Sequence, residues 1–280
     1  MRNIELLLQG KKLLQNSDIP NASLDSELIL SDILKISREK LLINLDAITI
    51  NCNQKKFFRK IKERMRKIPI AYILNKKEFW CTEFYVNDKV LIPRPDTELI
   101  VENSLNLVPV HSAKKILDIG SGSGCILISI LKERKLCRGT CLDISKSSIN
   151  VAKFNAKIQH LENRIRFINS SIDNFFISKY DLIVSNPPYI KKFSIKSLDD
   201  DIKFHEPKIA LDGGIDGLSE IYKVIKKSSK LLRRNGKLII EIDDNQVPWV
   251  KKMLINEKFY VNKLSKDLNG KIRNIISTKI

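Results

Sequence analysis

Four residues that can orient a small polar group, Asn186-Pro187-Pro188-Tyr189, follow directly on the apolar run Tyr180–Ser185. The run is short and rich in β-branched residues, which is typical of a buried strand. The prolines lack a backbone N–H and keep the preceding residues extended, so they end the strand and form a rigid shelf. Ligands bind beyond the strand ends of open α/β sheets, and this shelf is therefore a candidate site.

Such a shelf suits one chemical task, which is to hold a planar NH2 group for attack. The side-chain oxygen of Asn186 and a backbone carbonyl can each accept one N–H, and Tyr189 offers a flat aromatic face. Asn and Pro are also frequent in ordinary turns, so the motif alone leaves a turn and a site equally open. The residues upstream favour the site.

A glycine-rich stretch at 120–124 lies between two apolar runs, at 115–119 and 125–131. A strand, a glycine loop and a helix in this order let the backbone approach a ligand at a helix N-terminus. The spacing is G-x-G-x-G, and Cys125 stands at the position of the third glycine in the dinucleotide motif G-x-G-x-x-G. Asp118, just before the loop, would repel a pyrophosphate but attract an ammonium group. The stretch therefore favours S-adenosylmethionine as the ligand.

A second acidic residue, Asp143, ends the next predicted strand at 139–143, about 20 residues beyond the loop. A carboxylate at this position can accept hydrogen bonds from both ribose hydroxyls of a nucleoside. Its place just before Ser145 is also compatible with an ordinary helix cap. Both interpretations remain open from the sequence.

The elements that position these residues alternate between strands and helices. A helix at 145–159 and a strand at 165–168 precede the strand that carries the shelf. This order predicts an α/β fold with a doubly wound parallel sheet, and it places both candidate regions at the carboxyl edge of that sheet.

The C-terminal part of the chain is expected to complete the sheet. A strand at 237–242 is followed by an antiparallel hairpin at 259–264 and 272–278. The polar stretch 191–217 before them is predicted to be a long irregular flap on the substrate side.

About the first 70 residues show helical periodicity and no glycine-rich turn. The predicted helices lie at 4–16, at 24–33 with Ser23 as its cap and, basic in character, at 54–67, with a short segment at 37–42 before the last of them. This bundle carries no chemical constellation of its own. Its role is either structural or the binding of a partner.

A connector follows the bundle. Phe84-Tyr85-Val86 and Val90-Leu91-Ile92 flank the turn residues 87–89, which predicts a hairpin. Pro93–Glu98 then opens a helix that ends near Val108, with Asp96 or Thr97 as its cap.

The composition excludes some classes of protein. No apolar stretch of the 280 residues is long enough to cross a bilayer, and the N-terminus lacks a signal-peptide pattern, so we expect a cytoplasmic protein without a membrane partner. The net charge of +18 is compatible with a nucleic-acid partner, but the lysines are spread along the chain with one concentration at 55–67. No metal site is expected, since the cysteines lack the spacing of zinc ligands and are predicted to be reduced and structural: Cys52, Cys81, Cys125, Cys137 and Cys141.

Over nearly its whole length the sequence resembles the glutamine-N5 methyltransferases of peptide-chain release factors, the PrmC/HemK family. The residues that carry the resemblance are Ala71-Tyr72-Ile73 with Glu78-Phe79, Ile92 to Glu98, Asp118 to Gly124, Asp143, Asn186 to Tyr189, and Glu206-Pro207 with Ala210-Leu211. The Asn-Pro-Pro-Tyr motif is shared with methyltransferases of adenine and cytosine, so it specifies the chemistry better than the substrate. Pro93 to Glu98 is the more discriminating stretch.

The resemblance implies a seven-stranded, mostly parallel, Rossmann-like class I methyltransferase domain at 93–280. It also implies a helical substrate-binding domain at 1–75 and a β-hairpin linker at 76–92. The implied cofactor is S-adenosylmethionine, and the implied substrate is the glutamine of the Gly-Gly-Gln loop of release factors. We further expect a monomer without a stable nucleic-acid partner.

The resemblance also assigns site residues. The cofactor residues would be Asp118, Gly120, Ser121, Gly122, Ser123 and Gly124 at the methionine part, Asp143 at the ribose, Ile172 at the adenine and Asn186. Ile172 stands where the family often has a tryptophan, after an aspartate that is Ser171 here. Asn75 and Asp243 each replace a usual glycine, and a left-handed turn can tolerate the asparagine.

The shelf would bind the substrate through Asn186, Pro187, Pro188 and Tyr189, with Asn186, Pro187 and Tyr189 catalytic. In this hypothesis Asn186 and the Pro187 carbonyl accept the two amide hydrogens of the glutamine, and Tyr189 packs against the amide. The alternatives are a ribosomal-protein glutamine methyltransferase, a nucleic-acid adenine-N6 methyltransferase, or a non-catalytic RNA- or ribosome-binding protein on the same fold.

Overall fold

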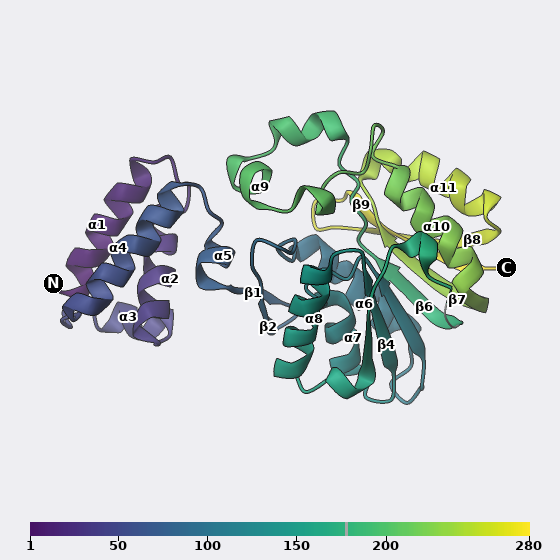
Figure 1. Cartoon of the computed structure of the whole chain (residues 1–280), viewed down its shortest axis with the longest axis horizontal. Helices are drawn as coiled ribbons and strands as arrows, with labels where there is room; N and C mark the ends of the chain where they lie inside the picture. The colour runs from purple at the N-terminus through teal and green to yellow at the C-terminus, as the bar shows by residue number, and fades with distance from the viewer. Residues whose placement is uncertain (177–178) are drawn as a thin grey trace. The chain divides into compact units, whose positions relative to one another are not determined.

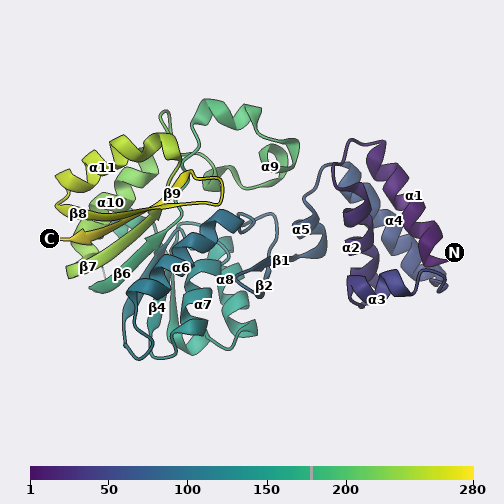
Figure 2. The ribbon, with the colours of Figure 1, turned by 180° about the vertical axis from the view of Figure 1, so that it is seen from behind.

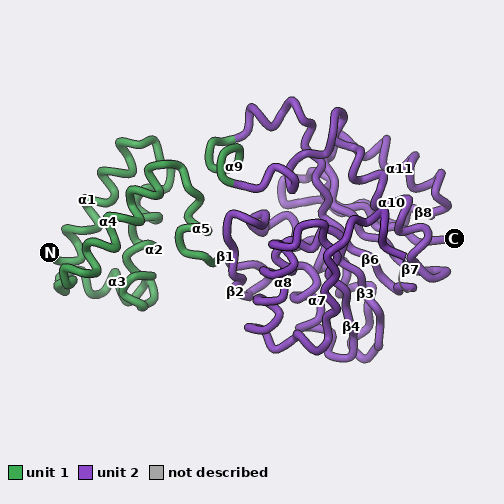
Figure 3. The backbone as a smooth tube through the Cα atoms, in the orientation of Figure 1, with its two compact units in different colours: residues 1–76, 199–205 green, residues 77–198, 206–280 purple. Residues whose placement is uncertain are grey.

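The computed structural model describes residues 1–176 and 179–280, which group into two compact units (Figure 1, Figure 3). The first unit comprises residues 1–76 together with 199–205, and the second comprises 77–198 together with 206–280. Within the described part of the chain, no helix combines the length and the apolar character that a membrane span requires.

The first unit is a helical bundle with a leucine-, isoleucine- and phenylalanine-rich core. Leu14, Ile29, Phe57 and Ile61 are completely buried where its longer helices meet. The helices are α1 (Asn3–Gln15), α2 (Ala22–Leu34), α3 (Arg38–Ile43), α4 (Asn51–Met65), α5 (Ile70–Leu74) and α9 (Asp200–His205).

The prediction of Ser23 as the cap of α2 is wrong. The helix begins at Ala22 after Asn21, so Ser23 lies inside the first turn, where its hydroxyl donates to Glu27 at 3.2 Å. Ser37, by contrast, caps α3, since its hydroxyl accepts from the backbone N–H of Lys40.

A buried guanidinium explains why residues 199–205 belong to the first unit. Arg64 on α4 contacts Asp25 of α2 at 2.7 Å and Asp201 of α9 at 2.7 Å. It also donates to the carbonyl of Ile68 at 3.0 Å. Because a buried charge is costly unless it is paired, these contacts hold α9 on the bundle.

The connecting hairpin lies earlier than predicted. Its strands are β1 (Lys76–Phe79) and β2 (Thr82–Tyr85), joined by a turn at Trp80 and Cys81 with φ of 50° and 51°. Residues 87–89 form a turn in which the Asn87 side chain accepts from the N–H of Lys89, but no strand follows it. The apolar residues after this turn are buried by packing rather than by strand pairing. Just before the hairpin, Asn75 adopts φ of 55°, which confirms the left-handed turn.

The described part of the second unit contains a seven-stranded sheet in the order β5-β4-β3-β6-β7-β9-β8. Figures 1 and 2 show the sheet from opposite sides, with helices packed around it. The first five of these strands are parallel, and β9 pairs antiparallel with both β7 and β8. The predicted fold class is confirmed. The strands are β3 (Lys115–Ile119), β4 (Arg138–Asp143), β5 (Ile165–Asn169), β6 (Tyr180–Ser185), β7 (Leu232–Glu241), β8 (Phe259–Lys266) and β9 (Ile272–Lys279).

Helices cover both faces of this sheet. One face packs against α6 (Glu98–Leu107), α7 (Cys125–Glu133) and α8 (Lys146–Ile158), and the other packs against α10 (Ser219–Leu231) and α11 (Val247–Asn256). Alternate residues of β6 enter opposite cores, Leu182 and Val184 on one side and Ile183 on the other. Burial on both faces is the reason these parallel strands read as continuous apolar runs.

The flap is more ordered than predicted. Between β6 and α10 the chain forms 3₁₀ turns at Lys192–Ser197 and Lys208–Ala210, with α9 between them. An isolated bridge pairs Ile190 with Asp212, which fastens the end of the flap beside the shelf.

Candidate active site

The strand order reverses at β3, because β4 and β5 lie on one side of it and β6 and β7 on the other. Residues beyond such a reversal splay apart and leave a crevice at the carboxyl edge. A cavity of about 450 Å³ is present in the second unit at this edge. Seven of its lining residues are predicted site residues: Gly120, Gly122, Asp143, Ile172, Asn186, Pro187 and Pro188.

The glycine loop is shaped by left-handed backbone. Gly122 has φ of 52°, and its N–H donates to the Asp143 carboxylate at 2.9 Å. Gly124 has φ of 79° and precedes α7, where a Cβ would lie 3.2 Å from the Cβ of Ala152 on α8. The loop therefore needs glycine both for its conformation and for the close approach of two helices.

Asp118 is completely buried behind the loop. Neither of its carboxyl oxygens has a hydrogen-bond partner of ordinary geometry among the described residues, although the backbone N–H of Leu127 is close enough to favour the charged form. Burial raises the pKa of this carboxyl to about 7, and the charge of Asp143 adds to the rise. An unpartnered buried carboxyl is costly, and a ligand that brings a positive charge would offset that cost.

Asp143 braces the loop from the neighbouring strand. Its carboxylate accepts from the N–H groups of Gly122 at 2.9 Å and Ser145 at 2.8 Å, and it lines the cavity. The cap of α8 is Ser145 itself, whose hydroxyl accepts from the N–H of Ser148. Burial raises the pKa of Asp143.

The far end of the cavity is lined by residues after β4 and β5. Ile144 is largely exposed there, and Ile172 is half-buried against the core beside α10. Ser171 starts a short 3₁₀ turn, since its hydroxyl accepts from the N–H of Asp173 at 3.3 Å. Two aliphatic side chains thus stand at this end of the cavity.

The shelf is fixed at several points. The Asn186 amide donates to the Thr97 hydroxyl at 3.0 Å. Gln246 donates to the carbonyl of Tyr189 at 3.0 Å. A Cβ at Gly213 would lie 2.8 Å from the carbonyl of Pro188, so the flap backbone presses closely on the shelf.

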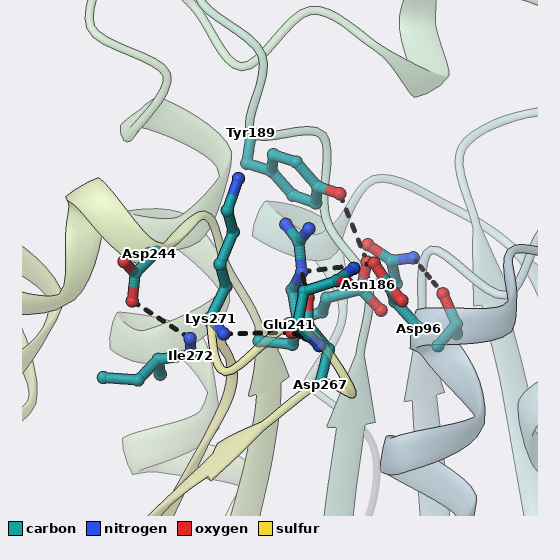
Figure 4. Close-up of polar contacts among 11 residues, drawn as sticks. Asp96, Asn186, Tyr189, Glu241, Asp244, Asp267, Lys271 and Ile272 are labelled. Atoms are coloured by element: carbon teal, nitrogen blue, oxygen red, sulfur yellow. Dashed lines mark hydrogen bonds and ion pairs between the residues drawn. The ribbon is translucent and has the colours of Figure 1, made fainter.

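Tyr189 does not line the cavity, and its side chain reaches toward Glu241 at the end of β7. Its phenol donates to Glu241 at 3.3 Å, and burial raises its pKa (Figure 4). The structure does not place every predicted site residue on the cavity wall: the exceptions are Asp118, Ser121, Ser123, Gly124 and Tyr189.

Sequence reasoning missed the environment of Glu241 and the contact of Thr97 with Asn186. Glu241 ends β7, is almost completely buried, and has a pKa that burial raises to about 7. An acidic residue at the end of an apolar strand was the signal that singled out Asp118 and Asp143, and it applies here too. Thr97 precedes α6 but makes no side-chain cap bond, and the same holds for Asp96, which pairs with Arg273 at 3.1 Å.

The described residues include no group of three or more His, Cys, Asp or Glu side chains able to hold a metal ion. The five cysteines are free thiols, of which Cys125, Cys137 and Cys141 are buried.

The sheet with its reversed final hairpin, the glycine loop and the two strand-end carboxylates together define a class I methyltransferase that uses S-adenosylmethionine. Two family profiles match the chain: "Methyltransferase small domain" at residues 96–199 and "PrmC N-terminal domain" at residues 5–74. A methyltransferase structure from Pyrococcus furiosus superposes with a TM-score of 0.53 at 16% identity, over 70% of this chain and 88% of that one. At that identity the likeness shows the fold.

Full-length relatives carry the comparison further. A release factor glutamine methyltransferase of Clostridium acetobutylicum is 36% identical over 100% of this chain and 99% of its own length. One of Fusobacterium nucleatum is 36% identical over 99% of this chain and 79% of its own length. The chain belongs to the release factor glutamine methyltransferase family, which confirms the resemblance seen in the sequence.

Proposed function

We propose that this protein transfers the methyl group of S-adenosylmethionine to the side-chain amide nitrogen of the glutamine in the Gly-Gly-Gln motif of peptide-chain release factors. One observation carries the proposal beyond family membership. Asn186 and Pro187 of the shelf line the same cavity as Gly120, Gly122 and Asp143. A donor and an acceptor bound there would meet within one enclosure.

The cofactor contacts are assigned from the donor groups present. Asp118, buried directly behind the loop, would attract the ammonium group, residues 120–124 would hold the methionine part, and Asp143 would accept hydrogen bonds from the ribose hydroxyls. Ile172 would cover the adenine with an aliphatic surface. The bound cofactor supplies an electrophilic methyl group on a sulfonium. The unpartnered Asp118 carboxyl supports this orientation, since a cation is what that group lacks.

The shelf orients the nucleophile. A glutamine amide nitrogen is weakly nucleophilic because its lone pair is delocalised into the carbonyl. Asn186 Oδ1 and the Pro187 carbonyl accept its two hydrogens and so turn the nitrogen toward the methyl group. These hydrogen bonds strengthen as the nitrogen gains positive charge, which lowers the barrier rather than only tightening binding. The C–S bond of the sulfonium breaks as the N–C bond forms, and the nitrogen loses one proton after the methyl transfer. Pro188 keeps the shelf extended, and Tyr189 limits its movement through Glu241.

The substrate assignment is tested by offering several acceptors with labelled S-adenosylmethionine. The acceptors are a release factor, the same factor with its Gly-Gly-Gln glutamine changed to alanine, ribosomal protein and duplex DNA. We expect label only in the unmodified release factor. Label in DNA or ribosomal protein instead would overturn the assignment.

Asn186→Ala tests the proposed part of Asn186 in methyl transfer. Loss of the amide acceptor should lower turnover by about 10²- to 10³-fold, as expected for a transition-state hydrogen bond. The affinity for S-adenosylmethionine, measured by calorimetry, should change by less than about threefold, because the glycine loop, Asp118 and Asp143 still hold the cofactor. Near-normal turnover in this variant would contradict the mechanism.

We place the enzyme in the cytoplasm, as a monomer that forms no stable complex with nucleic acid. The cavity and its lining belong to one unit of one chain, so a second copy is not needed to complete it. Light scattering at several protein concentrations tests the monomeric state. A mobility-shift assay with RNA at physiological salt tests whether a stable complex with nucleic acid forms.

A further inference from the structure

One face of α8 touches the glycine loop at two consecutive residues. Ala152 faces the loop, since its Cβ lies 3.2 Å from the position that a Cβ would take at Gly124. Asn155 is three residues further along the helix and therefore on the same face. Its side-chain NH2 group donates to the carbonyl of Ser123 at 2.9 Å.

The other contacts of Asn155 are made with β2 of the connecting hairpin. Its oxygen accepts from the backbone N–H of Tyr85 at 2.8 Å, and its NH2 group donates to the carbonyl of the same residue at 3.0 Å. β2 and α8 lie side by side (Figure 1, Figure 2), and the ring of Tyr85 meets that of Phe154 edge to face. One side chain thus joins the loop to the hairpin, although Ser123 and Tyr85 are 32 and 70 positions away from it in the sequence.

The Asn155 amide is fixed in one orientation. Its residue is buried, with 1% of its surface exposed. An asparagine side chain has two N–H donors and one acceptor oxygen, and here both donors meet carbonyls while the oxygen meets an N–H. If the amide turned over, its oxygen would face the carbonyls of Ser123 and Tyr85 and would leave them unpaired, which is costly in a buried place.

The glycine loop is held at two neighbouring residues by groups from different elements. The N–H of Gly122 donates to Asp143, and the carbonyl of Ser123 accepts from Asn155. Ser123 lies between two glycines with left-handed backbone, so a loop freed at Ser123 has many other conformations open to it. A loop that spends only a fraction of its time in the binding conformation lowers the apparent affinity for its ligand by that fraction.

We propose that Asn155 is a positioning residue for the cofactor, which holds the glycine loop in the conformation that receives the methionine part and ties that loop to the hairpin. Asn155 does not line the cavity and touches no reacting atom. The inference rests on the cofactor placement of the proposed function. In that placement the ribose and the adenine are bound by Asp143 and Ile172, so the loss of Asn155 should weaken the methionine end alone.

The test measures the binding of two ligands to Asn155→Ala by calorimetry. S-adenosylhomocysteine is the cofactor without its methyl group, and 5′-methylthioadenosine is a nucleoside that also lacks the amino-acid part. We expect the Kd for S-adenosylhomocysteine to rise about tenfold, as for a loop that is in its binding conformation about a tenth of the time. The Kd for 5′-methylthioadenosine should stay within about twofold. Equal weakening of both ligands, or of neither, would overturn the inference.

Asn103→Ala is the matched control. Asn103 on α6 is also buried, with 4% exposed, and its amide donates to the carbonyl of Leu99 at 2.7 Å and accepts from Ser265 at 3.2 Å. None of these groups belongs to the glycine loop, so both Kd values should stay within about twofold. A selective loss of S-adenosylhomocysteine binding in this variant would show that general loosening is the cause, and the assignment to Asn155 would fall.

Hydrogen exchange in the unmodified protein provides a measurement that does not depend on the folding of a variant. The Tyr85 amide donates to Asn155, so it reports on the side chain that holds the loop. The two ligands are compared at the same degree of saturation, which equalises their stabilisation of the fold by mass action. S-adenosylhomocysteine should slow exchange at Tyr85 at least about threefold more than 5′-methylthioadenosine does. Equal slowing by the two ligands would contradict the link between loop and hairpin.

The outcomes separate the two proposals. If the unmodified protein binds neither ligand, the cofactor placement of the proposed function fails. If it binds both, and Asn155→Ala binds S-adenosylhomocysteine as tightly as the unmodified protein, the positioning inference fails while the function stands.

Discussion

Asp118 and Glu241 are carboxyl groups enclosed at the ends of β3 and β7, and burial raises the pKa of each to about 7. Their surroundings differ in a way that separates their tasks. Neither oxygen of Asp118 has a hydrogen-bond partner of ordinary geometry among the described residues, whereas one oxygen of Glu241 accepts a hydrogen bond from the Tyr189 phenol and the other has none. The first is suited to meeting a charged ligand and the second to holding the shelf.

Cofactor affinity should therefore depend on pH. An ammonium group favours the charged carboxylate, so binding releases the proton that Asp118 holds below pH 7. We expect affinity to rise by up to about tenfold per pH unit from pH 5.5 to 7 and then to level off. Calorimetry over this range measures it. Asp118→Asn should bind more weakly and with a flatter profile, and an equally steep profile in that variant would assign the dependence to another group.

Glu241 makes a separate contribution to stability. The folded protein holds a proton on Glu241 that the unfolded chain loses, so the contribution is complete below about pH 4.5 and is lost as pH rises through about 7. The loss is on the order of 3 kcal/mol at most. Denaturant unfolding of the unliganded protein should show it, and Glu241→Gln should remove this share. A constant difference between the two proteins from pH 5 to pH 8 would contradict the assignment.

At the scale of elements, the start of α7 depends on one glycine. Gly124 has left-handed backbone, and its α-hydrogen faces Ile128 and Ala152, so a methyl group there strains the backbone and separates α7 from α8.

Gly124→Ala should lower the free energy of unfolding by about 2–3 kcal/mol and weaken cofactor binding. Gly270→Ala is the control, because Gly270 has φ of 78° but no atom within 4 Å of an added Cβ. It should cost about 1 kcal/mol, for backbone strain alone. Equal losses in the two variants would mean that helix packing at Gly124 plays no part.

The sequence predicted those elements whose signals are local. Tyr180–Ser185 forms β6 with the bounds expected from its apolar run, and the shelf follows where the prolines require it. The predicted hairpin was misplaced because Val86, Val90 and Ile92 are buried inside the second unit, and their alternating burial resembles that of paired strands. Among the site residues, Gly122 and Asp143 could be found from spacing. The contact of Thr97 with Asn186 could not, because it joins residues 89 positions apart and neither residue type reveals its partner.

At the scale of the whole molecule, the chain passes between its two units three times, after residues 76, 198 and 205. Residues 199–205, between the second and third crossings, are held in the first unit by Arg64, which pairs with both Asp25 and Asp201.

Asp201→Asn should loosen residues 199–205 while the rest of the bundle stays folded, since Arg64 keeps Asp25. Loss of a part-buried pair worth about 1 kcal/mol should speed amide hydrogen exchange in this segment roughly fivefold. Asp200→Asn is the control, because the Asp200 side chain is half exposed and pairs with Lys203 only at 3.5 Å. Exchange that is unchanged by Asp201→Asn would show that other contacts retain the segment.

The same three crossings limit how the gene can be divided. Neither unit corresponds to one uninterrupted stretch of sequence. A fragment that begins at residue 77 carries α9 without Arg64, and a fragment that ends at residue 76 leaves Arg64 with Asp25 as its one carboxylate. Shortened versions of this enzyme should therefore replace residues 199–205 with a polar linker. New chain termini should be placed at the junctions on either side of that segment, after residue 198 or after residue 205.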